Sequence, residues 1–232
     1  MIPLFSYELA VIIHDGMKRM VEHKENIFYY ITIMNENYEH PDMPEGVEQD
    51  IIQGMYCLKK GKEDANLKNR VQLLGSGTIL REVIAASELL EQDFSVASDV
   101  WSVTSFNLLG RDGLDVERWN RLHPKEKPRE AFITQCLKNT KGPVIAATDY
   151  IKQYANQVRE FIPKQYTVLG TDGFGRSDTR RQLRHFFEVD RYYITIAALQ
   201  ALAKDGQIPV EQVVAAMQKY QIDPEKPNPL IV

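Results

Sequence analysis

Residues 71–91, VQLLGSGTILREVIAASELLE, decide the fold. They begin with a short apolar run that is typical of a buried strand, followed by the tight turn Gly75-Ser-Gly77. From Thr78 onward the apolar residues recur at helical spacing, and the expected inward face consists of Ile79, Val83, Ala86 and Leu90. A strand, a glycine turn and an amphipathic helix in this order predict one strand–helix unit of a parallel sheet.

The same alternation continues toward the carboxyl end of the chain. Strands are expected at 95–105, 144–147 and 166–169, and helices at 106–138, 148–161, 178–187, 190–204 and 209–220. The longest helical stretch is broken near Pro124 and Pro128, because proline cannot continue a helix. The residues expected to face inward from the last helix are Val210, Val213, Val214 and Met217.

One more strand is expected at 54–60, before the strand that begins at Val71. The polar surface turn 59–70 connects the two strands, and so short a connection predicts that 54–60 is an antiparallel edge strand. The complete pattern predicts an α/β fold: a three-layer α/β/α sandwich with a mostly parallel sheet and an antiparallel edge strand.

The first 35 residues form a separate unit that cannot close a core alone. A helix is expected at 5–22 and a strand at 27–33. The helix places Leu9, Ile13, Met17, Met20 and Val21 on one face. We therefore expect 1–35 to be the end of a preceding domain, 36–53 a linker with a connecting helix, and 54–232 a carboxy-terminal domain.

Composition argues against several classes of function. The 232 residues include 28 basic and 32 acidic side chains, with a net charge of −4, so a nucleic-acid partner is not expected. No apolar run approaches the ~20 residues that span a membrane, and no membrane partner is expected. The cysteines, Cys57 and Cys136, show no metal-like spacing and favour a reducing, cytoplasmic setting.

Two glycine-rich turns are candidate binding sites. Gly75, Ser76, Gly77 and Thr78 follow a strand and open a helix, where free backbone N–H groups favour an anion. No further glycines complete a dinucleotide motif and no G-K-[ST] follows, so an ordinary tight turn is the favoured interpretation.

The second turn follows the strand at 166–169. Its candidate interface or ligand residues are Asp172, Gly173, Phe174, Gly175, Arg176, Ser177 and Asp178. Open α/β sheets place ligands at this end of their strands, but Phe174 suits an anchor at a domain or subunit contact, which we favour. Asp178 or Thr179 is expected to cap the next helix.

No catalytic constellation is apparent. The histidines share no ligand spacing, and no G-x-S-x-G motif is present. The dipeptide His14-Asp15 and His185 could act in acid–base chemistry, but they are better interpreted as surface or core-edge groups. We expect no catalytic, cofactor-binding or metal residue in this chain.

Nine stretches, in one order from end to end, resemble the homodimeric bacterial pyruvate dehydrogenase (acetyl-transferring) family, a branch of the transketolase-like superfamily. They are YELAVIIHDG (7–16), YYIT (29–32), NENY (35–38), MPEG (43–46), VQLLGSG (71–77), SDVWSVTSF (98–106), ERWN (117–120), LGTDGFGRSD (169–178) and LRHFFEVD (183–190). TDGFGRSD, at 171–178, is the most specific of them.

The resemblance implies a three-domain enzyme that binds thiamine diphosphate and Mg²⁺ between the subunits of a homodimer. Such enzymes decarboxylate pyruvate oxidatively and pass the acetyl group to lipoyl-lysine on the acetyltransferase component of a multienzyme complex, where the cofactor supplies the chemistry. It implies further that 1–35 ends the pyrimidine-binding domain and that the rest resembles the transketolase carboxy-terminal domain.

The departures limit what the resemblance implies. The family's G-D-G…N-N metal–diphosphate motif is absent, and its catalytic glutamate and histidines would lie upstream of Met1. The chain is thus expected to be structural, dimer-forming and inactive alone. Two alternatives remain open: an autonomous small-ligand or anion-binding module that uses the 170–178 loop, and the same domain of another transketolase-like enzyme.

Overall fold

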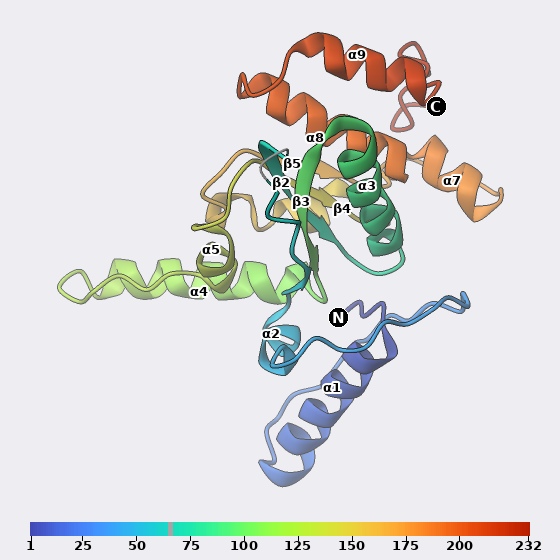
Figure 1. Cartoon of the computed structure of the whole chain (residues 1–232). Helices are drawn as coiled ribbons and strands as arrows, with labels where there is room; N and C mark the ends of the chain where they lie inside the picture. The colour runs from blue at the N-terminus through green and yellow to red at the C-terminus, as the bar shows by residue number, and fades with distance from the viewer. Residues whose placement is uncertain (65–66) are drawn as a thin grey trace.

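A computed structural model describes residues 1–64 and 67–232. Within them the chain forms one five-stranded sheet with helices on both faces (Figure 1). Its strands are β1 (Tyr56–Lys59), β2 (Asn69–Gly75), β3 (Val96–Ser102), β4 (Val144–Ala147) and β5 (Tyr166–Leu169). The predicted turn at 59–70 includes residues 65 and 66, which lie outside the described part of the chain.

The spatial order of the strands is β1-β3-β2-β4-β5. Four strands are parallel, and β1 runs antiparallel to β3 at one edge, so the predicted mostly parallel sheet with an antiparallel edge strand is confirmed. The partner of β1 is β3 and not β2, the strand that follows it in sequence. The short connection in sequence between β1 and β2 therefore does not make a hairpin of these two strands.

The helices complete the predicted three layers. On one face α3 (Ile79–Phe94) and α8 (Arg191–Lys204) pack on the sheet, and α9 (Val210–Lys219) packs on α8. On the other face lie α4 (Phe106–Leu122), α5 (Phe132–Leu137) and α6 (Lys152–Asn156). Figure 1 shows α4 projecting beyond the sheet as an arm. Each face has its own apolar core, because successive strand residues point to opposite sides.

Two helical predictions need correction. In α9 the buried residues are Val213 and Ala216, whereas Val210 and Val214 are exposed. The helix lies on the outside of α8, so only one narrow stripe is covered and its other apolar side faces solvent. The helix predicted at 148–161 is reduced to α6 and a 3₁₀ turn, Arg159–Phe161.

The predicted strand at 27–33 is wrong. These residues belong to neither helix nor strand, and their backbone bonds are isolated ones, such as that from Thr32 N to Met1 O at 3.0 Å. An apolar, β-branched run forms a strand only beside a partner with which it can build a ladder. The described residues supply no such partner, so the propensity of the run is not enough.

The first residues form an extension below the sheet (Figure 1). Helix α1 (Ser6–Met17) continues as a π-helical turn, Lys18–Glu22, close to the predicted helix at 5–22. After an extended segment comes α2 (Glu48–Gln53), which contacts α1. The remaining helix, α7 (Arg180–Phe186), follows the 170–178 loop, and Thr179 caps it by accepting a hydrogen bond from Gln182 N.

Candidate functional site

The candidate site lies at the carboxyl ends of β2, β4 and β5. Since the neighbours are parallel, the turns that follow them, at 75–78, 148–151 and 170–178, meet at one edge of the sheet. The chain passes from β2 to β3 on one side and later returns to β4 on the other, so the topological switch point lies between β2 and β4. Open α/β folds bind ligands at this point. The structure thus brings both glycine-rich candidates to one edge.

Asp149, after β4, joins the three turns. Thr78 Oγ1 donates to Asp149 Oδ2 at 3.5 Å, and Thr171 Oγ1 donates to the Asp149 carbonyl at 2.5 Å. The other carboxylate atom, Oδ1, is buried and has no hydrogen-bond partner among the described residues. Burial raises the pKa of this carboxyl above its ordinary value, because the charged form loses solvation. Sequence reasoning missed Asp149, although its position two residues after a buried strand was a usable signal.

The 75–78 turn is closed. Ser76 and Thr78 are buried, and Ser76 Oγ bonds to Thr148 Oγ1 at 2.9 Å. Gly77 adopts a φ of +52°, and a Cβ at this residue would lie 2.9 Å from Ile2 Cγ2. Ile2, itself buried, therefore covers the helix start from the amino-terminal segment. This geometry favours the tight turn over the anion site at Gly75, Ser76, Gly77 and Thr78.

The first half of the 170–178 loop is packed against the protein. Asp172 Oδ1 accepts a hydrogen bond from Lys152 N at 3.1 Å. Gly173, with a φ of +102°, lies against the tail, where a Cβ would be 2.3 Å from the Pro229 carbonyl oxygen. A side chain at 173 would collide with that backbone, which explains the glycine.

The second half of the loop is open. Phe174 is 78% exposed, and nothing lies within 4 Å of a Cβ built at Gly175. The Arg176 guanidinium lies over the Phe186 ring at 5.1 Å, and Asp178 Oδ1 accepts from Thr179 N. Ser177 is exposed. An exposed phenylalanine on a loop with a fixed base suits an interface anchor.

Helix α1 is fastened to the sheet by a buried carboxylate, Glu8, which is 0% exposed. Its Oε1 accepts from Tyr56 OH at 2.7 Å and from Ser102 Oγ at 2.6 Å, and its Oε2 accepts from the backbone of Leu4 and Phe5. Four donors satisfy this carboxylate, which would be costly to bury without partners. Sequence reasoning did not identify this contact, because it depends on strands distant in sequence.

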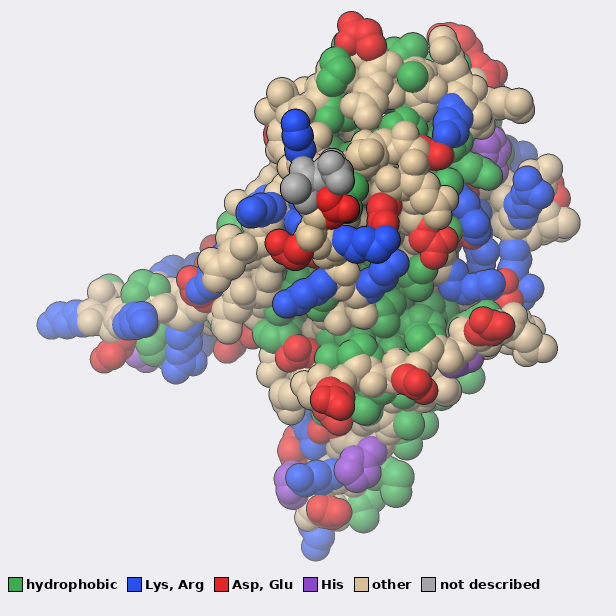
Figure 2. Space-filling view, in the orientation of Figure 1, with side chains coloured by type: hydrophobic (Ala, Val, Ile, Leu, Met, Phe, Trp, Pro, Cys, Tyr) green, Lys and Arg blue, Asp and Glu red, His purple; other side chains and the backbone are tan. Residues whose placement is uncertain are grey.

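Most of the face of α1 that the sequence predicts to be apolar is uncovered, and of its predicted residues only Leu9 is half-buried. The buried residues of α1 are Glu8, Ile12 and Gly16. Large apolar side chains remain exposed across 13–34, and Figure 2 shows some of them on the lower part of the molecule. They are Ile13, Met17, Met20, Val21, Phe28, Tyr30, Ile33 and Met34. We name this set the α1 apolar face. Many exposed apolar side chains within one short stretch of chain suit an interaction site.

A second fastening joins the segment after 35 to the domain. Glu36 pairs with Arg81 at 2.6 Å, with Arg184 at 3.2 Å and with Arg180 at 3.7 Å. Three arginines from α3 and α7 therefore hold one carboxylate of the extended segment. At Glu36 the segment predicted to be a linker is therefore held against the domain by ion pairs.

The described residues give little sign of metal or membrane chemistry. Among them no group of three His, Cys, Asp or Glu side chains could hold a metal ion. Nor does the described part of the chain contain a helix with the length and apolar character to cross a membrane. His185 Nδ1 lies 2.9 Å from Asp190 Oδ2, a pairing at the start of α8, whereas His14 is exposed and pairs with no carboxylate of the described residues.

Comparison with known proteins bears on this arrangement. Residues 54–190 match the transketolase-like TK C-terminal domain model, and residues 1–41 match the pyruvate dehydrogenase E1 component middle domain model. A pyruvate dehydrogenase E1 component from Cupriavidus necator is 60% identical over 99% of this chain and 26% of the relative. The Escherichia coli K12 protein of the same name is 53% identical over 98% of this chain and 25% of its own length.

Among solved structures, the transketolase from Leishmania mexicana aligns with a TM-score of 0.45 and 16% identity, over 70% of this chain and 20% of that one. The chain spans about a quarter of the length of the curated relatives it matches. More than half of its residues match one family model. The chain belongs to the family of transketolase-like TK C-terminal domains.

Proposed function

We propose that the chain is the carboxy-terminal segment of a pyruvate dehydrogenase E1 component, an oxidoreductase that decarboxylates pyruvate and transfers the acetyl group to lipoyl-lysine. The observation that carries the proposal is the 60% identity over 99% of this chain with a relative of that name. On this proposal the complete enzyme is a cytoplasmic homodimer in a multienzyme complex, with the lipoyl acetyltransferase component as its partner.

Within the enzyme the chain acts as a structural and docking segment. We assign 1–35 to the end of the pyrimidine-binding domain, 36–53 to the connection and 54–232 to the carboxy-terminal domain. The α1 apolar face is the surface that the rest of the pyrimidine-binding domain covers. Phe174, with its loop neighbours at 172–178, is the anchor for a second contact, with another domain or the second subunit.

The residues of this chain do not fit thiamine diphosphate and Mg²⁺. The switch point, where a diphosphate would find helix-start N–H groups, is closed by Ile2, and its carboxylate, Asp149, is buried beside it. Asp149 offers a diphosphate no positive charge, and the described residues include no group of three His, Cys, Asp or Glu side chains that could hold the metal. We therefore assign the cofactor and substrate sites to the rest of the enzyme.

The autonomous ligand module is the weaker alternative. The 170–178 loop packs at Gly173 against the carboxy-terminal tail at Pro229, whereas at Gly175 no other residue lies within 4 Å of a Cβ. Small-ligand sites are concave and enclosed, and this loop is neither. The second alternative, another transketolase-like enzyme, is disfavoured by the match of 1–41 to the middle domain of a pyruvate dehydrogenase component.

Titration of the chain with thiamine diphosphate and Mg²⁺ in a calorimeter tests the proposal. We expect no binding in the micromolar range. The polypeptide extended by its upstream reading frame is expected to bind the cofactor and to release CO₂ from pyruvate. Micromolar binding by the chain alone, or an extended enzyme that acts on sugar phosphates and not on pyruvate, would overturn the assignment.

The docking role has its own test in the extended enzyme. Phe174→Asp is expected to weaken the dimer and lower activity with little change in thermal stability, because the side chain is 78% exposed in this chain. Leu122→Asp, at the end of the α4 arm and 55% exposed, is the matched control. Equal effects of both variants would remove the role given to the loop.

A further inference from the structure

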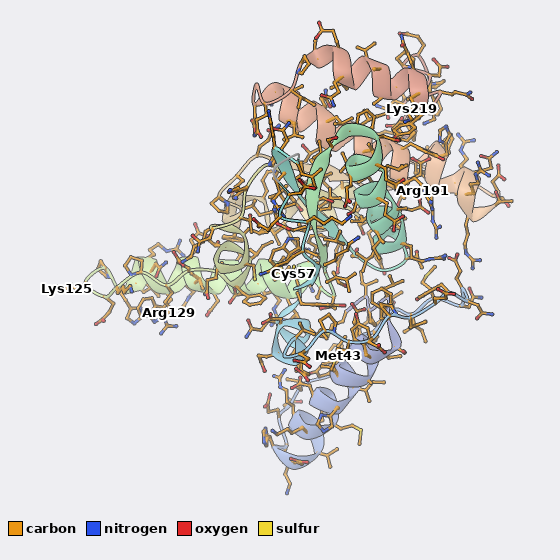
Figure 3. All side chains as sticks on the ribbon, in the orientation of Figure 1. Met43, Cys57, Lys125, Arg129, Arg191 and Lys219 are labelled. Carbon is orange, nitrogen blue, oxygen red and sulfur yellow. The ribbon has the colours of Figure 1, made fainter. Side chains whose placement is uncertain are left out.

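A polar groove of about 740 Å³ lies between α7, the start of α8 and the end of α9. Its lining contains no residue of the glycine turns at 75–78 and 170–178, and nothing in the proposed function uses it. Figure 2 shows Lys and Arg side chains gathered on the side of the molecule that α7 forms, and Figure 3 labels Arg191 and Lys219 at two borders of the groove. The charged side chains that line it are Arg181, Arg184, Arg191, Lys219, Glu82 and Asp190.

The groove has an excess of positive charge. Four cationic side chains face two carboxylates, so two positive charges are not balanced within the lining. Lys219 also pairs with Asp93 at 2.7 Å, outside the lining. By contrast, Arg181 is exposed and makes no ion pair within the described part of the chain. A concave surface with unpaired guanidinium charge is suited to an anion.

The arginines at the floor are fixed in place before any ligand arrives. Glu82 is only 6% exposed and accepts from Arg191 Nε at 2.9 Å and from Arg184 Nη1 at 3.2 Å. The second amino group of Arg184 bonds to Glu36 at 3.2 Å. One carboxylate thus holds two guanidinium groups without neutralising both, and a rigid donor set loses little entropy on binding.

Several donors remain unused. Within the described residues Arg191 Nη1 and Arg184 Nε make no hydrogen bond, and all five N–H groups of Arg181 are without a partner. His185 Nε2 likewise bonds to none of the described residues, while its Nδ1 faces Asp190. A phosphate group offers the several acceptor oxygens that such a set can bind, and arginine forks match its geometry.

We propose that this groove binds a small phosphorylated anion, with Arg181 and Arg191 as its main donors. Lys219, at the end of α9, and His185, on α7 with Arg181, complete the polar lining. Tyr192 and Tyr220, whose rings lie 4.9 Å apart, form a wall for the organic part of such a molecule. The inference does not depend on the proposed function, because it rests on the side chains that line the groove and on Glu36, which holds Arg184.

Inorganic pyrophosphate, titrated into the isotopically labelled chain at low ionic strength, tests the site. Amide NMR shifts are expected at 181–185, 190–192 and 219–221, and the apparent Kd should rise with added salt. Since hydrogen bonds to charged groups contribute strongly, Arg181→Gln should raise the Kd by about tenfold or more. Arg181 supports no ion pair, so its loss should leave the thermal unfolding temperature unchanged.

Arg180→Gln is the matched control, because Arg180 is the neighbouring arginine but lines no part of the groove and pairs with Glu36. It should change the Kd less than twofold. The proposal fails if both variants weaken binding equally, or if the shifts fall outside the groove. It also fails if sodium chloride at the same ionic strength produces the same shifts, since that result would show screening of surface charge and no site.

Discussion

Tyr56 donates a hydrogen bond of 2.7 Å from its hydroxyl to the fully buried carboxylate of Glu8. Tyr7 OH lies 2.6 Å from Tyr56 OH, and burial raises the pKa of Tyr7 to about 12 and that of Tyr56 further. The two phenols therefore stay neutral donors throughout the physiological pH range. This pair joins α1 to β1, so the first helix and the sheet are expected to unfold together.

Removal of one donor from Glu8 tests this coupling. Tyr56→Phe should lower the free energy of unfolding by about 2 kcal/mol, because a buried carboxylate loses a hydrogen bond that solvent cannot replace. Urea unfolding followed by circular dichroism measures the change. Tyr30→Phe, with a side chain that is 77% exposed, should alter stability by less than about 0.5 kcal/mol. Equal losses in the two variants would contradict the role of Glu8.

Because Gly77 lies close to Ile2, a side chain at position 77 is expected to lower the free energy of unfolding. Gly206→Ala, at a φ of +70° with nothing within 4 Å, should cost about 1 kcal/mol for the left-handed backbone alone. Gly77→Ala should cost more, because its Cβ also meets Ile2 Cγ2. Adding Ile2→Ala should remove that extra cost. A double-mutant cycle by chemical unfolding gives the coupling, and a coupling of zero would show that Ile2 does not cover the turn.

Asp149 predicts a pH dependence. Its folded-state pKa is raised by burial, so the folded chain binds the proton more tightly than the unfolded chain. The contribution of Asp149 to the free energy of unfolding is therefore most favourable at pH values below its pKa in the unfolded chain. This contribution is lost as the pH rises through its pKa in the folded chain. Asp149→Asn should gain stability relative to the parent as pH increases from acid to neutral. Thermal unfolding across this range measures it, and a stability difference that does not vary with pH would contradict the prediction.

The α1 apolar face predicts self-association of the isolated chain, because exposed apolar surface is removed from water in a contact. Sedimentation velocity should show a weight-average mass that rises with concentration. Met17→Glu with Val21→Glu should reduce this rise. Val214→Glu, on α9 and 49% exposed, should not. A strictly monomeric parent chain at high concentration would count against the α1 apolar face as a docking surface.

Local patterns were sufficient for most of the fold. The strand at 71–74 and the helix after it formed as predicted, with Ile79, Val83, Ala86 and Leu90 all buried, because one unbroken apolar stripe meets the sheet. The run at 27–33 failed for the opposite reason. Its side chains suit a strand, but a ladder needs a second strand, and none of the described residues pairs with it. Propensity is local, whereas pairing is not.

The features of the candidate site also separate into those that local sequence determines and those that depend on distant contacts. Sequence alone determined the α/β layers, the two glycine turns and the absence of a local catalytic motif, because these depend on composition and on spacing within a few residues. Only the tertiary structure decided that Ile2 closes the turn at Gly77, that Asp149 joins three strand ends, and that Glu82 fixes Arg184 and Arg191 at one groove. These contacts join residues 22 to 109 positions apart in the chain, and no pattern in a single sequence specifies which distant side chains will meet.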